Sequence, residues 1–386
     1  MIAKFFNRVS FREGRRRYLN LKGIISKQYA YKGPDIIQID LTDKCNSRCL
    51  VCWNNSPVKE KEREASFGSL DFSKVKDFIR DVVKLGTREV IFSGGGEPFC
   101  YPRIWEILEW TEKKGIKFHI NTNFTLLGKE EINKLLNFKK LTSLTISIWS
   151  GKCGLYSKLH GRKDDTLYKL IDNIKYLNRV KSSNLYVKIA TIVSNINYLQ
   201  LRDLLDLMSE TGCSNIEFGV CDVIPGVTDS FLLNNHQIDA LKTNFSELLK
   251  YIKKKRHKIK IVNKKRFLKR ISNPSACHGE YDSYVEKTPC YSGWIFLRLR
   301  TNGDFNSCLK SHRVPIGNLY RESIFSVWNN SLQQKFRRES LCIPKNLEYF
   351  KFIGNGNDNT VGCKRICDNV LANEYLHRII KFLVWF

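Results

Sequence analysis

The sequence of 386 residues lacks several features that would assign it to other protein classes. No apolar run reaches the roughly 20 residues that a membrane-spanning helix needs. The N-terminus has no apolar segment ending in small residues, so it does not resemble a secretory signal. No repeat of long period occurs beyond an alternation of strand and helix patterns. We therefore expect a cytoplasmic protein.

Acidic residues are scarce beside basic ones, at 38 Asp and Glu against 65 Lys and Arg, for a net charge of +27. Such a surface attracts anions. The basic clusters at 12–17 and 253–270 show neither the aromatic interleaving nor the motif of a nucleic-acid module, so we expect no nucleic-acid partner. Both chain ends interleave aromatic and basic residues, which leaves two alternatives open: peripheral contact with the inner face of a membrane, or docking on the protein's own surface.

Cysteine is abundant, and its 13 copies cannot form a fully paired disulfide framework. Cys45, Cys49 and Cys52 share one short stretch with the spacing C-x3-C-x2-C. A four-iron cluster normally takes four thiolates. This loop therefore predicts a cubane with one iron open to another ligand, and the alternative is a structural zinc site that lacks one ligand.

Strand-like runs alternate with helical periodicity between residues 36 and 254. We expect strands at 36–41, 89–93, 117–121, 143–148, 185–193 and 216–220, and helices at 72–83, 104–110, 129–137, 165–179, 198–210 and 236–254. Six such units predict an α/β fold with a parallel sheet and helices outside it. They are too few for an eight-fold barrel, so we expect an open, partial (β/α)6 TIM-like barrel, with reactive loops at the carboxyl ends of the strands.

A glycine-rich loop follows the second expected strand. The sequence Ser93-Gly-Gly-Gly-Glu-Pro98, one unit after the three cysteines, resembles the radical S-adenosylmethionine (radical SAM) family. The resemblance implies that Cys45, Cys49 and Cys52 hold a [4Fe–4S] cluster whose fourth iron is chelated by S-adenosylmethionine. An electron from a donor such as flavodoxin or ferredoxin then releases a 5′-deoxyadenosyl radical, which abstracts hydrogen from a substrate.

The resemblance also suggests which residues contact the cofactor. They lie in the glycine-rich loop or near strand ends: Gly94, Gly95, Gly96, Glu97, Asn123, Ser147 and Asn195. Many family members have an aromatic residue before the third cysteine. Here that position is Val51 and the aromatic residue is Trp53, which we assign to the adenine side. Each polar residue taken alone could instead be a turn or cap residue.

A second group of cysteines resembles the SPASM/twitch extension of one branch of the family. Cys290 and Cys308 flank a hairpin pattern with the turn Thr301-Asn-Gly-Asp304, and Cys363 and Cys367 follow. The resemblance implies an auxiliary [4Fe–4S] cluster on these four thiolates, and zinc is the alternative. Cys277 and Cys342 are substitutes for these ligands or ligands of a further cluster. The cysteines that lie singly in the middle of the chain read as small buried apolar residues: Cys100, Cys153, Cys213 and Cys221.

We divide the chain into four parts: a basic amphipathic extension at 1–34, the core barrel at 35–260, the auxiliary domain at 270–370 and an apolar, basic tail at 371–386. A boundary is expected near the basic segment 253–275. Only residues 1–35 precede the first strand, whereas the peptide-modifying branch often carries a longer leader-binding domain there.

We therefore expect an enzyme that dehydrogenates or epimerises a small molecule such as a sugar or glycan precursor. The alternative is radical modification of a peptide or protein, through thioether or crosslink formation or maturation of a partner enzyme. The alternative outside enzymology is a basic metal-binding adaptor. The candidates for a catalytic base, among which the sequence does not choose, are Asp222, Glu217, Lys188 and Tyr156.

Overall fold

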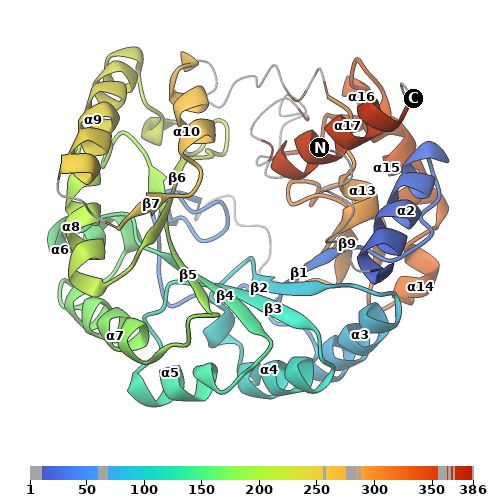
Figure 1. The fold of residues 1–386 in the computed structure, drawn as a ribbon, viewed down its shortest axis with the longest axis horizontal. Coiled ribbons are helices and arrows are strands. Elements are labelled where there is room, and N and C mark those ends of the chain that lie inside the picture. Colours follow the sequence, from blue (N-terminus) through green and yellow to red (C-terminus); the bar gives the residue numbers. More distant parts are fainter. Residues whose placement is uncertain are drawn as a thin grey trace.

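The computed structural model describes residues 11–59, 68–254, 258–274, 285, 288–354, 363, 367 and 370–384. Its centre is a ten-stranded sheet in the order β10-β9-β8-β1-β2-β3-β4-β5-β6-β7. Figure 1 shows this sheet as an open arc with most of the helices along its outer side. The fold is the α/β partial barrel that the alternation predicts.

The strands are β1 (Ile36–Asp40), β2 (Glu89–Ser93), β3 (Lys117–Thr122), β4 (Leu141–Ser147), β5 (Tyr186–Val193), β6 (Asn215–Val220), β7 (Lys260–Ile261), β8 (Phe296–Leu299), β9 (Asp304–Asn306) and β10 (Gly317–Asn318). The helices of the barrel are α3 (Phe72–Lys84), α4 (Ile104–Lys113), α5 (Lys129–Leu136), α6 (Cys153–His160), α7 (Thr166–Val180), α8 (Leu201–Thr211), α9 (Asn235–Lys254) and α10 (Lys264–Ile271). All six predicted strands and all six predicted helices are confirmed. The sequence analysis did not anticipate α6, β7 or α10.

The strands alternate between two environments, which is why their positions could be read from the sequence. In β5, every second residue is buried. The same alternation in β3 buries Phe118 and Ile120 on the helix side and leaves His119 and Asn121 on the opposite side. The helices complete the core with apolar faces, as α3 does with Val75, Phe78, Ile79 and Val82. The concave side of the sheet therefore carries polar side chains such as those of His119 and Asn121.

Two of the candidate bases lie on the concave side of the sheet, before the carboxyl ends of their strands. Lys188 and Glu217 each occupy the third position of their strand and form an ion pair with one another. Beside them, the His119 Nε2 and Thr145 Oγ1 atoms lie 2.9 Å apart. These side chains sit below the carboxyl ends of the strands, where the reactive loops of such a sheet begin.

The C-terminal hairpin extends the core sheet. β8 pairs in parallel with β1, from Ile36 opposite Phe296 to Ile39 opposite Leu299. β8 and β9 then form the predicted antiparallel hairpin, in which Gly303 takes the turn with φ +87°. The expected boundary at 253–275 instead carries β7 and α10, and β7 pairs with β6 of the core. The hairpin can join the core sheet because the edge of β1 that faces away from β2 is available to pair with β8.

Both terminal helices pack on α13 (Ser292–Ile295). At Gly23 of α2 (Phe11–Ile25), a Cβ atom would lie 2.9 Å from the Trp294 ring. Near the C-terminus, Asn373 of α17 (Val370–Val384) accepts a hydrogen bond at Oδ1 from the N–H of Tyr291, the residue before α13, at 2.8 Å. These described parts dock on the protein itself, and contact with a membrane stays a prediction. None of the described helices is long and apolar enough to span a bilayer.

A buried ion pair joins the hairpin to the first strand. The Arg298 Nη2 atom lies 2.6 Å from Asp40 Oδ2, and both side chains are at most 4 % exposed. Gln38 donates a further hydrogen bond to Asp40 Oδ1 at 2.9 Å. Arg298 also donates to the Leu309 carbonyl, beside Cys308. The pair therefore links the end of β1 to the loop that carries Cys308.

Replacing Arg298 by Met should lower the free energy of unfolding by about 3–5 kcal/mol, because it leaves the Asp40 carboxylate buried without its cation. Urea denaturation of the metal-free chain, followed by circular dichroism, measures the change. The matched control is Arg103→Met, which removes an ion pair with Glu106 in which both side chains are 49 % exposed. This pair should matter little because water screens it. Equal effects of the two substitutions would contradict this role of Arg298.

Candidate functional site

The three cysteines of the first group lie on the loop that leaves β1. Burial raises the pKa of the Cys45 thiol to about 12 and the pKa of the Cys49 thiol well above its ordinary value. The negative charge of the Cys52 thiolate adds to both shifts, so the three sulfurs lie near one another. Binding of a metal cation would have to displace these protons.

Each of the three sulfurs has a nitrogen within hydrogen-bonding distance. The Ser47 N–H donates to Cys45 Sγ at 3.4 Å, and the Asn55 N–H donates to Cys52 Sγ at 3.2 Å. The Nδ1 atom of His160 lies 3.3 Å from Cys49 Sγ. Cluster sulfurs accept such hydrogen bonds, which help to set the reduction potential. The donor set therefore fits an iron–sulfur cluster with three protein ligands.

The glycine-rich loop after β2 lies against the cysteine loop. The Gly96 N–H donates to the Thr42 carbonyl at 2.8 Å, and the Glu97 N–H donates to the Lys44 carbonyl at 2.9 Å. The Gly95 carbonyl accepts from the side-chain amides of both Asn54 and Asn55, each at 2.7 Å. Backbone groups of the glycine-rich loop, which we expected to contact the cofactor, thus form hydrogen bonds that join the two loops.

Only glycine fits at the three central positions of this loop. A Cβ atom on Gly94 would lie 1.9 Å from Asp40 Oδ1, and one on Gly95 would lie 1.8 Å from Asp43 Oδ1. At Gly96 it would lie 2.0 Å from the Lys44 carbonyl oxygen. Gly94 also has φ +115°, which L side chains rarely adopt. The loops approach closely because these side chains are missing.

The carboxylate of Glu97 is buried and ties the end of β2 to the end of β3. It accepts hydrogen bonds from Thr122 Oγ1 at 2.7 Å, from the Asn123 N–H at 2.7 Å and from the Phe99 N–H at 3.3 Å. Burial raises its pKa to about 7, while the three donors oppose the shift. The side chain thus positions the loops through contacts within the protein.

The other predicted cofactor residues fall into three settings. Asn123 faces the cysteine loop, where its amide donates to Asn46 Oδ1 at 2.8 Å. Ser147 ends β4, as predicted. Asn195 donates instead to the Ser230 carbonyl at 2.6 Å, in the loop after β6. The structure therefore brings Asn123 to the cysteine loop, whereas the Asn195 side chain donates to a loop elsewhere.

Trp53 points toward the C-terminal hairpin. Its ring lies 5.0 Å from the Arg298 guanidinium and 6.3 Å from the His312 ring. The cation–π contact attaches the cysteine loop to the same arginine that pairs with Asp40. Assignment of Trp53 to the adenine side stays a prediction.

The two remaining candidate bases sit near the predicted clusters. Asp222, after β6, pairs with Lys310, which lies two residues beyond Cys308. Tyr156 is fully buried in α6, and the Cys49 thiolate contributes to the raised pKa of its hydroxyl. Asp222 therefore lies between the core barrel and the second cysteine group.

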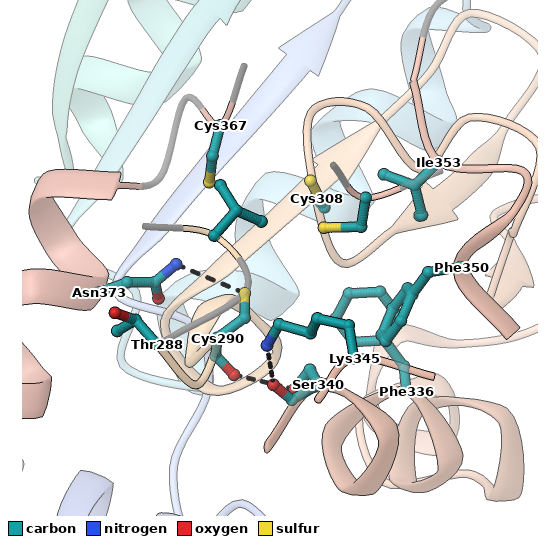
Figure 2. Close-up of a pocket in the computed structure, with 12 residues that line it drawn as sticks. Thr288, Cys290, Cys308, Phe336, Ser340, Lys345, Phe350, Ile353, Cys367 and Asn373 are labelled. Atoms are coloured by element: carbon teal, nitrogen blue, oxygen red, sulfur yellow. Dashed lines mark hydrogen bonds between the residues drawn. The ribbon is translucent and has the colours of Figure 1, made fainter. Parts of the chain in front are cut away.

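The second cysteine group converges on one small cavity. The sulfurs of Cys290, Cys308 and Cys367 point toward this cavity, whose lining also includes Cys363 (Figure 2). Its volume is about 40 Å³. Burial and the nearby Cys290 thiol raise the pKa of the Cys363 thiol to about 12. Four thiols around one cavity match the ligand number of a four-iron cluster.

One lysine lines this cavity and a second lies near it. Lys345 lines it, is only 5 % exposed and donates to the Ser340 carbonyl at 2.6 Å. The charges of Lys345 and Lys310 partly oppose the rise in the Cys363 thiol pKa. A cluster with four thiolate ligands is anionic, so these cations complement it. The site thus fits an auxiliary [4Fe–4S] group.

Two further cysteines were proposed as ligands. Cys342 is exposed at the end of α15 (Ser331–Leu341) and is not among the residues that line the cavity. Cys277 lies outside the described residues. Within the described part of the chain, no three His, Cys, Asp or Glu side chains are grouped as ligands of a single metal ion.

The sequence analysis missed several residues of the first site. Asn54 and Asn55 directly follow the cysteine motif, so their position alone could have drawn attention to them. His160 gave no such signal, because it lies 111 positions from Cys49 in a helix that the periodicity did not predict. Burial and the charge of Arg162 lower its pKa to about 3.

Comparisons with known proteins agree with this arrangement. The chain matches the model of the radical SAM superfamily over residues 39–208 and that of the SPASM iron–sulfur cluster-binding domain over residues 290–348. It is 23 % identical over 369 residues to the antilisterial bacteriocin subtilosin biosynthesis protein AlbA of Bacillus subtilis, covering 89 % of this chain and 72 % of AlbA.

Shorter similarities and solved structures add to this. A tungsten-containing aldehyde ferredoxin oxidoreductase cofactor-modifying protein of Pyrococcus furiosus is 24 % identical over 178 residues, 46 % of this chain and 48 % of that protein. Streptococcus suis SuiB bound to precursor peptide SuiA superposes with a TM-score of 0.63 at 18 % identity, covering 93 % of this chain and 80 % of SuiB. Native anSMEcpe with bound AdoMet gives 0.62 at 14 %, covering 90 % and 96 %. The chain thus spans about half the length of the Pyrococcus relative.

The buried Glu97 carboxyl should make stability depend on pH. An unfolded Glu loses its proton near pH 4.3, whereas Glu97 in the folded chain holds it to about pH 7. The folded state binds more protons in this window, so the free energy of unfolding should fall as pH rises through it. Glu97→Gln should reduce this slope, by at most about 1.4 kcal/mol per pH unit.

Urea denaturation of the metal-free chain between pH 5 and 7 measures the slope. Glu130→Gln, at an exposed position of α5, is the matched control and should leave it unchanged. A slope that is the same in wild type and Glu97→Gln would show that this carboxyl does not carry the pH dependence.

Replacing Cys290, Cys308, Cys363 and Cys367 together by alanine should remove about half of the bound iron and sulfide, because one of two four-iron clusters is lost. Iron, sulfide and zinc analysis of the anaerobically reconstituted chain measures this. Cys342→Ala is the control and should keep both clusters. Loss of zinc in place of iron, or unchanged iron, would contradict an auxiliary cluster at this site.

Proposed function

The chain belongs to the radical SAM superfamily and carries a SPASM iron–sulfur domain, and from this membership we propose that it modifies a peptide substrate by radical chemistry. Cys45, Cys49 and Cys52 hold the cluster that binds S-adenosylmethionine in this proposal. Cys290, Cys308, Cys363 and Cys367 hold the auxiliary cluster. The chain is an enzyme, and the proposal concerns the class of its substrate.

The observation that carries the peptide assignment is the alignment with AlbA. This alignment covers 89 % of the chain, so it extends beyond the core barrel into the auxiliary domain. AlbA is a bacteriocin biosynthesis protein by its name, and bacteriocins are peptides. The proposal therefore takes the radical modification of a peptide, which the sequence analysis held as its alternative, in place of the small molecule it preferred.

Solved structures of similar fold support the proposal by example. SuiB has been solved with its precursor peptide, and anSMEcpe has been solved with AdoMet and the Kp18Cys peptide. The fold of this chain is thus one that accommodates a peptide. Its sheet has two edges, β10 and β7, at opposite ends of the order, and these leave the arc open.

When bound, the cofactors would supply the radical chemistry that takes hydrogen from the substrate, with Cys45, Cys49 and Cys52 holding the cluster that binds S-adenosylmethionine. The protein positions these groups. Three glycines allow the loops after β1 and β2 to lie together, and Glu97 fixes the neighbouring loop after β3. The polar concave face offers hydrogen-bonding groups to a peptide backbone.

Asp222 is the candidate that we propose for proton transfer. It lies after β6 and forms an ion pair with Lys310, whose backbone N–H donates to Cys308 Sγ. Asp222 therefore lies between the core barrel and the auxiliary site. Lys310 is 8 % exposed and forms an ion pair with the Asp222 carboxylate. An ionised carboxylate can accept the proton that leaves when a substrate is oxidised.

An electron donor is a further part of the proposal. The net charge of +27 would attract an acidic redox protein such as flavodoxin or ferredoxin. The basic helix α10, with the sequence KKRFLKRI, provides one such surface. Association of this kind should weaken at high salt because exposed charges are screened.

Anaerobic reconstitution with a reductant and S-adenosylmethionine tests the chemistry. The wild-type chain should form 5′-deoxyadenosine, and the variant with Cys45, Cys49 and Cys52 replaced by alanine should form none above background. A basic metal-binding adaptor would give no product with either chain. Chromatography with mass detection measures the product.

The substrate class is tested by expressing the chain with short precursor-peptide genes from its genomic neighbourhood. A crosslink should appear as the loss of two hydrogen atoms in the peptide mass, and the triple cysteine variant should leave the mass unchanged. Unmodified peptides together with turnover of a sugar or glycan precursor would favour the small-molecule alternative.

A further inference from the structure

The three sulfurs of the cysteine loop receive their hydrogen bonds from different kinds of donor. For Cys45 and Cys52, the donors are backbone N–H groups two and three residues further along the same loop. For Cys49, the partner is the ring of His160, 111 positions away. The loop itself thus provides two of these contacts, and α6 provides the third.

The hydrogen bonds of the His160 ring determine which nitrogen carries the proton. The Trp149 backbone N–H lies 3.2 Å from Nε2 and can only donate. Nε2 must therefore accept and carries no proton. In a neutral imidazole the proton is then on Nδ1. Nδ1, at 3.3 Å from Cys49 Sγ, is accordingly the donor to the sulfur.

The ring is held between two aromatic residues. Its centroid lies 4.6 Å from that of Trp149 and 4.4 Å from that of Tyr156, and its residue is only 1 % exposed. A ring enclosed in this way keeps its orientation toward Cys49. Water cannot easily replace it as the donor.

The backbone around His160 is attached to the cysteine loop as well. The Arg48 N–H donates to the His160 carbonyl at 3.1 Å, and the Leu50 N–H donates to the Leu159 carbonyl at 2.9 Å. Gly161 follows with φ +58°, where a Cβ atom would lie 2.6 Å from the Arg48 carbonyl oxygen. The end of α6 and the segment around Cys49 are therefore fixed against each other on both sides.

We propose that His160 is a positioning residue that donates an Nδ1–H hydrogen bond to Cys49 and thereby raises the reduction potential of the cluster held by the triad. The proposal rests on the proposed ligation of that cluster by Cys49 and is independent of the substrate. Reduction adds negative charge to the cluster and its sulfurs. A hydrogen bond to a thiolate sulfur stabilises the reduced form more than the oxidised form, so it makes reduction easier.

Two amide substitutions separate the donor from the rest of the ring. The side-chain nitrogen of Asn occupies the place of Nδ1, so His160→Asn can still donate to Cys49. The amide of Gln occupies the place of Nε2, so His160→Gln can still accept from Trp149 but loses the donor to the sulfur. Both variants remove the aromatic ring, which makes each the control for the other.

The measurement is a potentiometric titration of the reconstituted full-length chain, followed by electron paramagnetic resonance. The signal of the triad cluster is the one that the Cys45, Cys49 and Cys52 triple alanine variant lacks. For His160→Gln we expect the equilibrium constant of one-electron reduction to fall roughly tenfold, a shift of about 59 mV to lower potential. For His160→Asn we expect a value close to wild type.

Equal potentials in the two variants would overturn the proposal, whether both are shifted or both are unchanged, because the donor would then not be what matters. A signal that persists in the triple alanine variant would instead overturn the ligation itself, so the two failures are distinguishable. A second measurement needs no substitution at His160. In wild-type protein with 15N-labelled histidine, pulsed resonance should detect coupling of the reduced cluster to a ring nitrogen, and absence of that coupling would overturn the proposal.

Discussion

The contact between the loops after β1 and β2 is the constraint on which the rest of the site depends. The two segments are close enough that a single added methyl group at any of three consecutive positions would collide with Asp40 at the end of β1 or with a side chain or carbonyl of the loop after it. Backbone hydrogen bonds then connect them from Thr42 to Lys44. Since the cysteines share the loop after β1, these contacts fix the cysteines and the glycine-rich loop relative to each other.

Further contacts join the C-terminal hairpin and the loop after it to the core barrel and to the cysteine loop. Arg298 contacts Asp40 at the end of β1, the Trp53 ring in the cysteine loop and the Leu309 carbonyl beside Cys308. Lys310 adds the ion pair with Asp222. Arg298 therefore connects the two loops that carry the predicted cluster sites.

Much of the barrel could be predicted from the sequence, because burial on one face gives each strand a period of two and each helix an amphipathic pattern. Glu89–Ser93 and Asn235–Lys254 were within one residue of expectation for this reason. The short helix Cys153–His160 was missed because much of it is buried around its circumference, so its pattern carries no clear period. The pairing of β8 with β1 was also missed, since no local pattern encodes a partner so far along the chain.

The candidate site could likewise be predicted from the sequence only in part. Cys45, Cys49 and Cys52, together with the three glycines, could be found because their spacing is local. The donor to Cys49, the partner of Asp222 and the role of Arg298 could not, because each joins residues that only the folded chain brings together. The pairing of Ile36 with Phe296 has a consequence for biosynthesis. At translation rates of about 5–20 residues per second, one edge of β1 stays unpaired for roughly 10–50 s while the chain is being made. The nascent barrel therefore exposes an unpaired strand edge next to the cysteine loop until the last third of the chain emerges, and an unpaired edge is a place where another chain can pair.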